Sequence, residues 1–311
     1  MTIPTQPSIV NISHSFSPDP SRLRGFVASA LNLTGTEQFT VSDANRGRGV
    51  FSTVVRVSAG ERSVVVKSPA IEAAVTSGAC QREAYAYQHL LPQSPIGSPR
   101  VHLIAHYDDT ATEFVLEDLG PHRQVSQLDG LEADDVFAIV DELKAFHQYW
   151  QDDDRLGSIT VRRSAPSGIH PPDNAVDIPV FAAVRHHRQR LIEAFDDGPP
   201  TLCHGDPRAD NIAFGPSPIF FDWQQIAIQP GYADLAWLAA TSIRPELRRE
   251  LDHSIAARYG MDFDSYRKGF VLPGLAVQML ASRPATDSRT KAMVAMSLER
   301  IGAALQDLDV V

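Results

Sequence analysis

Two stretches of the sequence decide the fold: LCHGDPRADN at residues 202–211 and IFFDW at residues 219–223. Each starts with apolar residues typical of a strand and then runs into polar, loop-forming residues. Asn211 follows Asp206 by five residues, and Asp222 follows Asn211 by eleven. A carboxylate, an amide and a second carboxylate at these spacings suit one reaction, the transfer of a phosphoryl group from a nucleotide to a hydroxyl.

This reaction needs a carboxylate that orients and deprotonates the attacking hydroxyl, and Asp206 fits that role. Asn211 and Asp222 fit a second role, because Mg²⁺ is a hard cation that prefers carboxylate and amide oxygens. Arg208 would lie beside the transferring phosphate. The alternative is that acids next to Gly and Pro only form turns. Two strand–loop stretches at the right separation favour the catalytic interpretation.

The spacing resembles the catalytic loop of protein kinases, with Gly205 in place of the middle arginine. The order His-Gly-Asp, Asn, Asp-Trp is similar to that of the aminoglycoside phosphotransferase and choline kinase superfamily. DWQ at residues 222–224 and LEDL at residues 116–119 are most similar to its ecdysteroid-kinase-like branch. The resemblance spans roughly residues 48–238.

The resemblance implies an α+β, bilobal protein-kinase-like fold with two lobes of different composition. Residues 1–118 would form a small antiparallel-sheet N-lobe that binds the nucleotide. Residues 119–311 would form a mainly helical C-lobe that carries the catalytic residues and binds the acceptor. A chain of 311 residues is also long for one hydrophobic core, which favours two lobes.

The N-terminal half is rich in strand signals. β-Branched runs at residues 51–57 and 63–67, joined by a turn, predict a hairpin. Gly47 and Gly49 precede it, where a phosphate-covering loop would lie, although a hairpin turn without a ligand fits them equally well. Lys67 ends a run of valines, so its ammonium must find an anion or reach solvent.

The resemblance implies that Lys67 holds the nucleotide phosphates and pairs with a glutamate of the next helix. Glu83, on a helix predicted over residues 79–91, is the candidate partner, and Glu72 is a less favoured substitute. The alternatives are an exposed strand end for Lys67 and an ordinary surface acid for Glu83.

Two more strands are predicted at residues 101–105 and 113–117. The segment after them resembles the hinge between the lobes, where the backbone of Glu117 and Leu119 would bind the adenine edge. Beyond the hinge the apolar period becomes helical, with stripes over residues 136–150, 247–259 and 294–308. Loop-rich tracts are expected over the first ~18 residues and over residues 155–178.

Other polar and aromatic residues near the decisive stretches have two interpretations. Asp234 matches a family position that braces the catalytic loop, or is a helix N-terminal acid. His204 would organise the loop backbone, with proton acceptance from Asp206 as the alternative. Trp223, Tyr232 and Trp237 would line an acceptor pocket, but their spacing favours the core.

Composition limits the function classes. The chain has 28 Lys and Arg against 38 Asp and Glu, a formal charge of −10, which argues against binding to nucleic acid or anionic membranes. Cys80 and Cys203 are too few and too separated for a disulfide framework. The first twenty residues lack the pattern of a signal peptide. We therefore expect a cytoplasmic protein.

Together these features predict a phosphotransferase that uses ATP, with GTP as the alternative, and Mg²⁺. The acceptor would be a hydroxyl of a small molecule such as a metabolite, amino alcohol, sugar or antibiotic. One alternative is a catalytically silent, kinase-like protein that only binds a nucleotide or metabolite. A protein kinase is disfavoured by Gly205 and by the lack of an Ala-Pro-Glu segment after Asp222. The sequence does not predict an oligomeric state.

Overall fold

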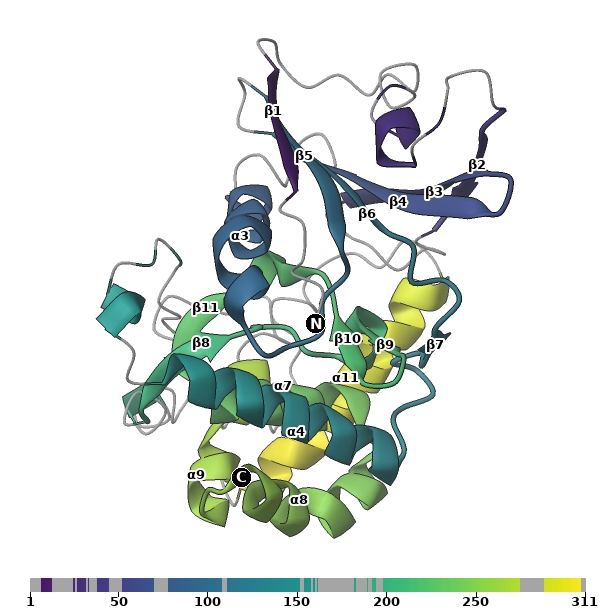
Figure 1. Ribbon diagram of the computed structural model, residues 1–311. Coiled ribbons are helices and arrows are strands. Elements are labelled where there is room, and N and C mark those ends of the chain that lie inside the picture. The colour runs from purple at the N-terminus through teal and green to yellow at the C-terminus, as the bar shows by residue number, and fades with distance from the viewer. Residues whose placement is uncertain are drawn as a thin grey trace. The chain divides into compact units, whose positions relative to one another are not determined.

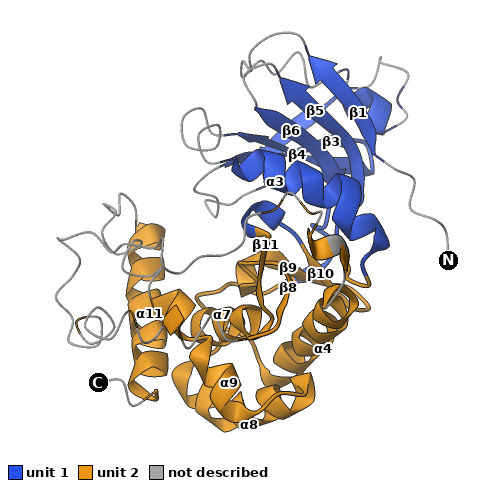
Figure 2. Cartoon of the chain, turned by 90° about the vertical axis from the view of Figure 1, so that its left-hand side faces the viewer, with its two compact units in different colours: residues 1–94, 98–123, 221–225 blue, residues 95–97, 124–220, 226–311 orange. Residues whose placement is uncertain are grey.

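The computed structural model describes residues 7–12, 25, 27–31, 33, 38–44, 52–69, 78–107, 111–151, 154–157, 159, 161, 182, 189, 192–193, 198–274 and 288–308. The chain divides into two compact units (Figure 2). Unit 1 comprises residues 1–94, 98–123 and 221–225, and unit 2 comprises residues 95–97, 124–220 and 226–311. The short segment around Asp222 thus belongs to unit 1 although it lies late in the sequence.

Unit 1 is built on a six-stranded sheet with the strand order β1-β5-β6-β4-β3-β2 (Figure 1). Its strands are β1 (Ser8–Ile12), β2 (Thr40–Asp43), β3 (Ser52–Ala59), β4 (Arg62–Pro69), β5 (Val101–Tyr107) and β6 (Thr112–Glu117). The predicted hairpin is confirmed as β3 and β4, which pair antiparallel through a turn at Gly60, whose φ of 60° suits glycine. The prediction of loop at the N-terminus is wrong for Ser8–Ile12, which pairs parallel with β5 at the sheet edge.

Alternation along β4 gives the sheet of unit 1 two different faces. Val64 and Val66 are fully buried in one apolar cluster with Val27 and Val57. Lys67 lies on the opposite face, because successive side chains of a strand point to opposite sides. The predicted helix over residues 79–91 is α3 (Ala79–Tyr85), which continues as a π-helical turn (Ala86–Leu90) and a 3₁₀ turn (Leu91–Gln93).

Unit 2 is mainly helical, and among its described residues the strands are short. Its helices are α4 (Ala133–Trp150), α7 (Tyr232–Ser242), α8 (Pro245–Tyr259), α9 (Phe263–Lys268) and α11 (Ser288–Gln306). Strand β8 (Pro200–Cys203) pairs with β11 (Ala227–Pro230), and β9 (Ile212–Phe214) pairs with β10 (Pro218–Phe220), with β7 (Arg123–Gln124) on the other side of β9. The 3₁₀ turns described in unit 2 are Asp154–Gly157 and Ala209–Asn211, whereas the 3₁₀ turn Trp223–Gln225 belongs to unit 1.

Helix α7 lies in the core of unit 2, and all of its residues except Trp237 are buried. The apolar stripe predicted over residues 136–150 is confirmed as the buried face of α4. Packing of these apolar faces, rather than intrinsic helix propensity, supplies most of the helical stability. Together the two units confirm the predicted α+β composition, with a sheet in one and helices dominating the other.

Some predictions lie outside the described residues. Gly47, Gly49 and Glu72 are among them, as is most of the tract 155–178 that we expected to be loop-rich. Within the described part of the chain, no helix combines the length and apolar character needed to cross a membrane.

Candidate active site

The predicted catalytic loop follows β8 in unit 2. Cys203, the last residue of β8, is buried and pairs with Ala227 of β11, so the loop starts from a fixed strand end. Gly205 has a φ of 84°, a left-handed conformation that glycine adopts without steric cost. The loop then closes in the 3₁₀ turn that ends at Asn211, directly before β9.

Helix α7 holds the backbone of this loop. The buried Asp234 carboxylate accepts hydrogen bonds from the backbone N–H of His204 at 2.7 Å and of Gly205 at 2.9 Å. Further along the helix, Ser242 Oγ accepts from the backbone N–H of Ala209 at 2.9 Å. Asp234 lies in the first turn of α7, where the helix dipole stabilises a negative charge. The predicted bracing role of Asp234 therefore has a direct structural basis.

Two residues that sequence reasoning missed extend this brace. His147 of α4 lies with Nε2 3.1 Å from Asp234 Oδ2 and with Nδ1 2.8 Å from the hydroxyl of Tyr259 at the end of α8. A Cβ at Gly231 would lie 2.9 Å from His147 Nδ1, so only glycine fits beside the ring. The brace thus connects three helices to the catalytic loop.

His147, Cys203 and Asp234 place one potential metal ligand each within 4.8 Å of one another. Each of these groups already has a hydrogen-bond partner, including the Gln229 carbonyl oxygen for the thiol. Burial raises the pKa of the Cys203 thiol well above its ordinary value, which opposes the thiolate form that metals bind. The three residues are therefore better explained as a hydrogen-bonded brace than as a metal centre.

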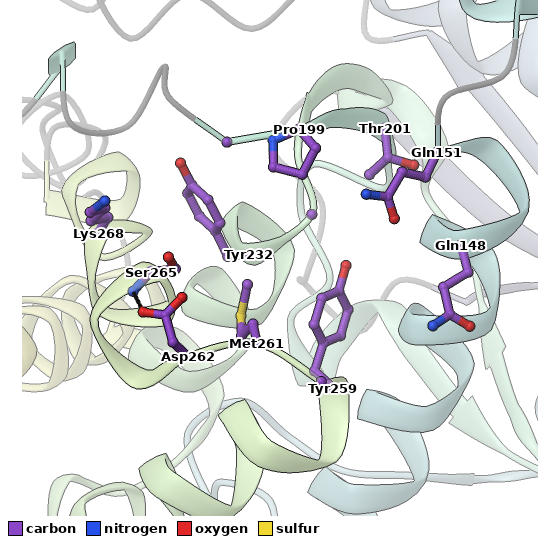
Figure 3. A pocket seen from close by; sticks show the side chains of 13 residues that line it. Gln148, Gln151, Pro199, Thr201, Tyr232, Tyr259, Met261, Asp262, Ser265 and Lys268 are labelled. Atoms are coloured by element: carbon purple, nitrogen blue, oxygen red, sulfur yellow. Dashed lines mark hydrogen bonds between the residues drawn. The ribbon is translucent and has the colours of Figure 1, made fainter.

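Tyr259 also lines a cavity of about 290 Å³ in unit 2 (Figure 3). Tyr232, Gln148 and Thr201 also line this cavity, as does Asp262, whose side chain caps α9 by accepting from the backbone N–H of Ser265 at 2.8 Å. The brace behind the catalytic loop therefore borders a hollow rather than a fully packed core.

The side chain of Asp206 is held by donors on both oxygens. The indole N–H of Trp237 donates to Oδ1 at 2.7 Å. Asn211 Nδ2 donates to Oδ2 at 3.1 Å and to the Asp206 carbonyl oxygen at 2.9 Å, and an Arg208 guanidinium nitrogen lies 3.5 Å from Oδ2. The structure therefore brings together Asp206, Arg208 and Asn211.

A second group of predicted residues meets in unit 1. Lys67 Nζ donates to both oxygens of Glu83, at 2.8 and 2.7 Å, and to Asp222 Oδ1 at 2.7 Å. The Glu83 side chain is fully buried and that of Lys67 is 9% exposed, whereas Asp222 is 32% exposed. Burial lowers the pKa of Lys67, but the nearby carboxylates of Asp222 and Glu83 outweigh it and raise the pKa above its ordinary value. The two carboxylates thus favour the charged form of Lys67.

Asp222 has an unusual backbone. Its φ is 67°, and among the described residues it is the one non-glycine residue in the left-handed region. The segment around it is anchored in unit 1, because Arg82 Nε donates to the Gln224 carbonyl oxygen and Gln224 Nε2 donates to Ser52 Oγ, both at 3.0 Å. Trp223 is fully buried, as its spacing favoured.

The segment predicted to bind adenine follows β6 in unit 1. The Glu117 backbone N–H donates to the Arg100 carbonyl oxygen at 2.8 Å, and the Leu119 carbonyl oxygen accepts from the backbone N–H of His122 at 3.0 Å. Between them, Asp118 pairs with the Arg56 guanidinium at 2.7 and 3.0 Å. Burial raises the pKa of Asp118, but its bonds from Arg56, Ser63 Oγ and the Gly120 N–H lower it overall.

Comparison with known proteins places these residues in a family. Residues 45–269 match the model of the phosphotransferase enzyme family. Comparison with curated protein sequences finds no match.

Several solved structures share the fold at low identity. The GDP and kanamycin complex of APH(2")-IIia has a TM-score of 0.65 and 14% identity, covering 91% of this chain and 99% of that one. Choline kinase LicA from Streptococcus pneumoniae has a TM-score of 0.62 and 12% identity, with coverage of 90% and 99%. Amicoumacin kinase hAmiN, in complex with AMP-PNP, Ca²⁺ and Ami, has a TM-score of 0.57 and 15% identity, with coverage of 91% and 93%.

These comparisons confirm the predicted kinase-like fold and the resemblance to the aminoglycoside phosphotransferase and choline kinase superfamily. The similarity to the ecdysteroid-kinase-like branch stays a prediction.

Proposed function

Because the chain belongs to the phosphotransferase enzyme family, we propose that it transfers the γ-phosphoryl group of ATP to a hydroxyl of a small molecule, with Mg²⁺ as cofactor. We place this reaction in the cytoplasm, where both ATP and Mg²⁺ are supplied. The acceptor would be a hydroxylated metabolite, amino alcohol, sugar or antibiotic.

The observation that carries the proposal is the buried ammonium of Lys67, which bonds the carboxylates of both Glu83 and Asp222. A strand lysine paired with a helix glutamate is the arrangement by which kinase-type sites hold nucleotide phosphates. Two carboxylates against one ammonium carry one excess negative charge when both are ionised, while burial raises the pKa of Glu83 and so opposes its charge. A cation fits this local charge, and the partly exposed Asp222 is the carboxylate within its reach.

Mg²⁺, when bound, would neutralise charge on the phosphate oxygens. Asp222 would hold it through carboxylate oxygen and Asn211 through amide oxygen, the hard ligands that Mg²⁺ prefers. Asn211 Nδ2 donates both of its hydrogen bonds to Asp206, so the amide oxygen of Asn211 is the atom that would bind Mg²⁺. The β9–β10 hairpin separates the two residues in the sequence: Asn211 directly precedes it, and Asp222 follows it by two residues. Ile212 and Phe220, the first and last residues of the hairpin, pair with each other.

Asp206 would orient the acceptor hydroxyl and take its proton as the new bond forms. The acceptor oxygen bonds to the γ-phosphorus while the bond to the β,γ-bridging oxygen breaks, and the nucleoside diphosphate leaves with that electron pair. Arg208, whose guanidinium is next to the Asp206 carboxylate, would offset the charge on the transferring group.

Nucleotide selection would use the backbone after β6. The Glu117 N–H and the Leu119 carbonyl are bonded within the protein, so the Glu117 carbonyl and the Leu119 N–H are the groups we propose for the adenine edge. GTP is the alternative donor, and similar structures hold GDP or the ATP analogue AMP-PNP.

The test is a turnover screen with Mg-ATP and, separately, Mg-GTP against a panel of hydroxylated metabolites, amino alcohols, sugars and antibiotics. We expect at least one acceptor to gain one phosphoryl group by mass spectrometry, with stoichiometric release of nucleoside diphosphate. The Asp206→Ala variant is the blank. Tight nucleotide binding without turnover for any acceptor, and without slow hydrolysis by water, would instead support the silent binding protein.

A further inference from the structure

Trp237 makes a direct hydrogen bond to the catalytic carboxylate. Its indole N–H donates to Asp206 Oδ1 at 2.7 Å, a short bond of the kind that charged acceptors form. Trp237 lies three residues after Asp234 on α7, so the two side chains share one face of the helix. Asp234 binds the backbone of the loop, and Trp237 binds its reacting side chain.

The rest of the Asp206 carboxylate is held from another direction. Asn211 Nδ2 lies 3.1 Å from Oδ2, and the Arg208 guanidinium lies 3.5 Å from the same oxygen. A carboxylate with donors of different residues on its two oxygens cannot rotate freely about its terminal torsion. Of these donors, the indole is the one outside the loop itself, because Arg208 and Asn211 belong to the same ten-residue stretch.

The chemistry of indole suits this task. It carries one N–H donor and no acceptor, so it cannot take the acceptor's proton in place of Asp206. Its ring packs against the buried cluster of Tyr232, Ala233 and Leu272, which fixes the direction of the N–H. A rigid donor on a buried helix therefore sets the plane of the carboxylate.

We propose that Trp237 is a positioning residue that aims the Asp206 carboxylate at the acceptor hydroxyl. The inference rests on the proposed phosphotransferase function. Loss of the N–H should lower kcat about 10- to 100-fold, the cost expected when a reacting group is misplaced by a fraction of an ångström to 1 Å. The KM for the nucleotide should stay within about twofold, because the phosphates are not bound through this bond.

The kinetic test compares Trp237→Phe with an isosteric replacement by 3-benzothienylalanine, which exchanges the N–H for sulfur and keeps the ring size. Both should show the same loss of kcat. Met261→Leu, which alters the same apolar cluster without touching Asp206, is the packing control and should keep wild-type kcat. An isostere with wild-type kcat, or an equal loss in Met261→Leu, would show that Trp237 acts through packing alone and would overturn the inference.

A second measurement, by NMR, does not require the acceptor substrate to be known. The chain has three tryptophans, so its ¹H–¹⁵N spectrum contains three indole signals, and Trp237→Phe identifies one of them. Asp206→Asn should move that signal and leave those of the buried Trp150 and Trp223 in place. An unmoved Trp237 signal contradicts the inference, whereas full turnover by Asp206→Ala would contradict the proposed function itself.

Discussion

The two groups of residues in the proposed site are held in opposite ways. In unit 1, Lys67, Glu83 and Asp222 come from distant parts of the chain and bond one another directly through opposite charges. In unit 2, Asp206 sits on a loop whose backbone N–H groups and side chain are bonded by residues of one helix, α7. Under the proposed function, the charge pairs would exchange partners when phosphates and a cation bind, whereas the braced loop would keep its geometry during the reaction. In the proposed function, the Lys67 group would bind the nucleotide phosphates and the Asp206 loop would orient the acceptor hydroxyl.

The largest effects on turnover should follow the removal of one carboxylate from each group. Asp206→Ala should lower turnover by about 10²- to 10⁴-fold, the usual contribution of a general base, and leave nucleotide affinity nearly unchanged. Asp222→Ala should lower turnover at least as much and also remove the Mg²⁺ dependence of nucleotide binding. Calorimetric titration of the nucleotide with and without Mg²⁺ separates the two.

Asp222→Asn is the matched control, since asparagine tolerates the left-handed backbone and keeps one oxygen ligand. Equal loss of nucleotide affinity in the Asp206 and Asp222 variants would show that the two groups do not divide the work.

The next largest effect concerns stability. Lys67→Met removes the cation from a fully buried Glu83 and should destabilise the protein by about 3–5 kcal/mol, the typical cost of leaving a buried charge without its partner. Glu83→Gln in the same chain should recover part of that loss. Urea unfolding of the two single variants and the double variant gives the coupling energy, and strictly additive losses would argue against a direct pair.

Substitutions in the brace behind the catalytic loop should have smaller effects on stability. Asp234→Asn places an N–H₂ group against the N–H groups of His204 and Gly205 and should cost about 1–3 kcal/mol, because a buried donor loses its acceptor. Tyr259→Phe removes only the bond to His147 and should cost about 1 kcal/mol. Amide hydrogen exchange of residues 204–209 should rise in both variants, more in the first. Unchanged exchange in Asp234→Asn would show that α7 does not hold the loop.

The smallest effect is the pH dependence of the Arg56–Asp118 pair. The pKa of Asp118 is lowered in the folded protein, so the pair contributes stability above the ordinary carboxylate pKa and loses it as pH falls through the folded value. Arg56 is 31% exposed, and solvent screening keeps the contribution to about 1 kcal/mol. Asp118→Asn should therefore melt lower than wild type at pH 7, and the gap should close below about pH 4. A gap that does not change with pH would point to lost packing instead.

Local patterns in the sequence predicted much of this architecture. The valine-rich runs predicted the β3–β4 hairpin, and the helical stripes predicted α4, α8 and α11, because burial of one face imposes a period that is visible in a single sequence. Strand β1 was missed because its partner, β5, lies 95 residues away in the sequence and a short edge strand leaves little local signal.

The residues of the proposed site stand in local sequence motifs, whereas the residues that hold them in place do not. Lys67, Glu83 and Asp206 stand in motifs, but His147 makes its bonds to Asp234 and Tyr259 across 87 and 112 residues. A signal was present, since His147 falls on the apolar stripe of α4, where a buried polar group needs a partner. For Trp237, the sequence signal was its position three residues, or about one helical turn, after Asp234, which puts both side chains on the same face of α7.

The left-handed backbone of Asp222 has a consequence for anyone who selects variants of this protein. An L-amino acid with a Cβ costs about 1 kcal/mol in that conformation, and glycine does not. Asp222→Gly should therefore resist heating better than Asp222→Ala, although both have lost the carboxylate. A library sorted for thermal tolerance alone should enrich glycine at this position, and under the proposed function its most heat-resistant members would be inactive.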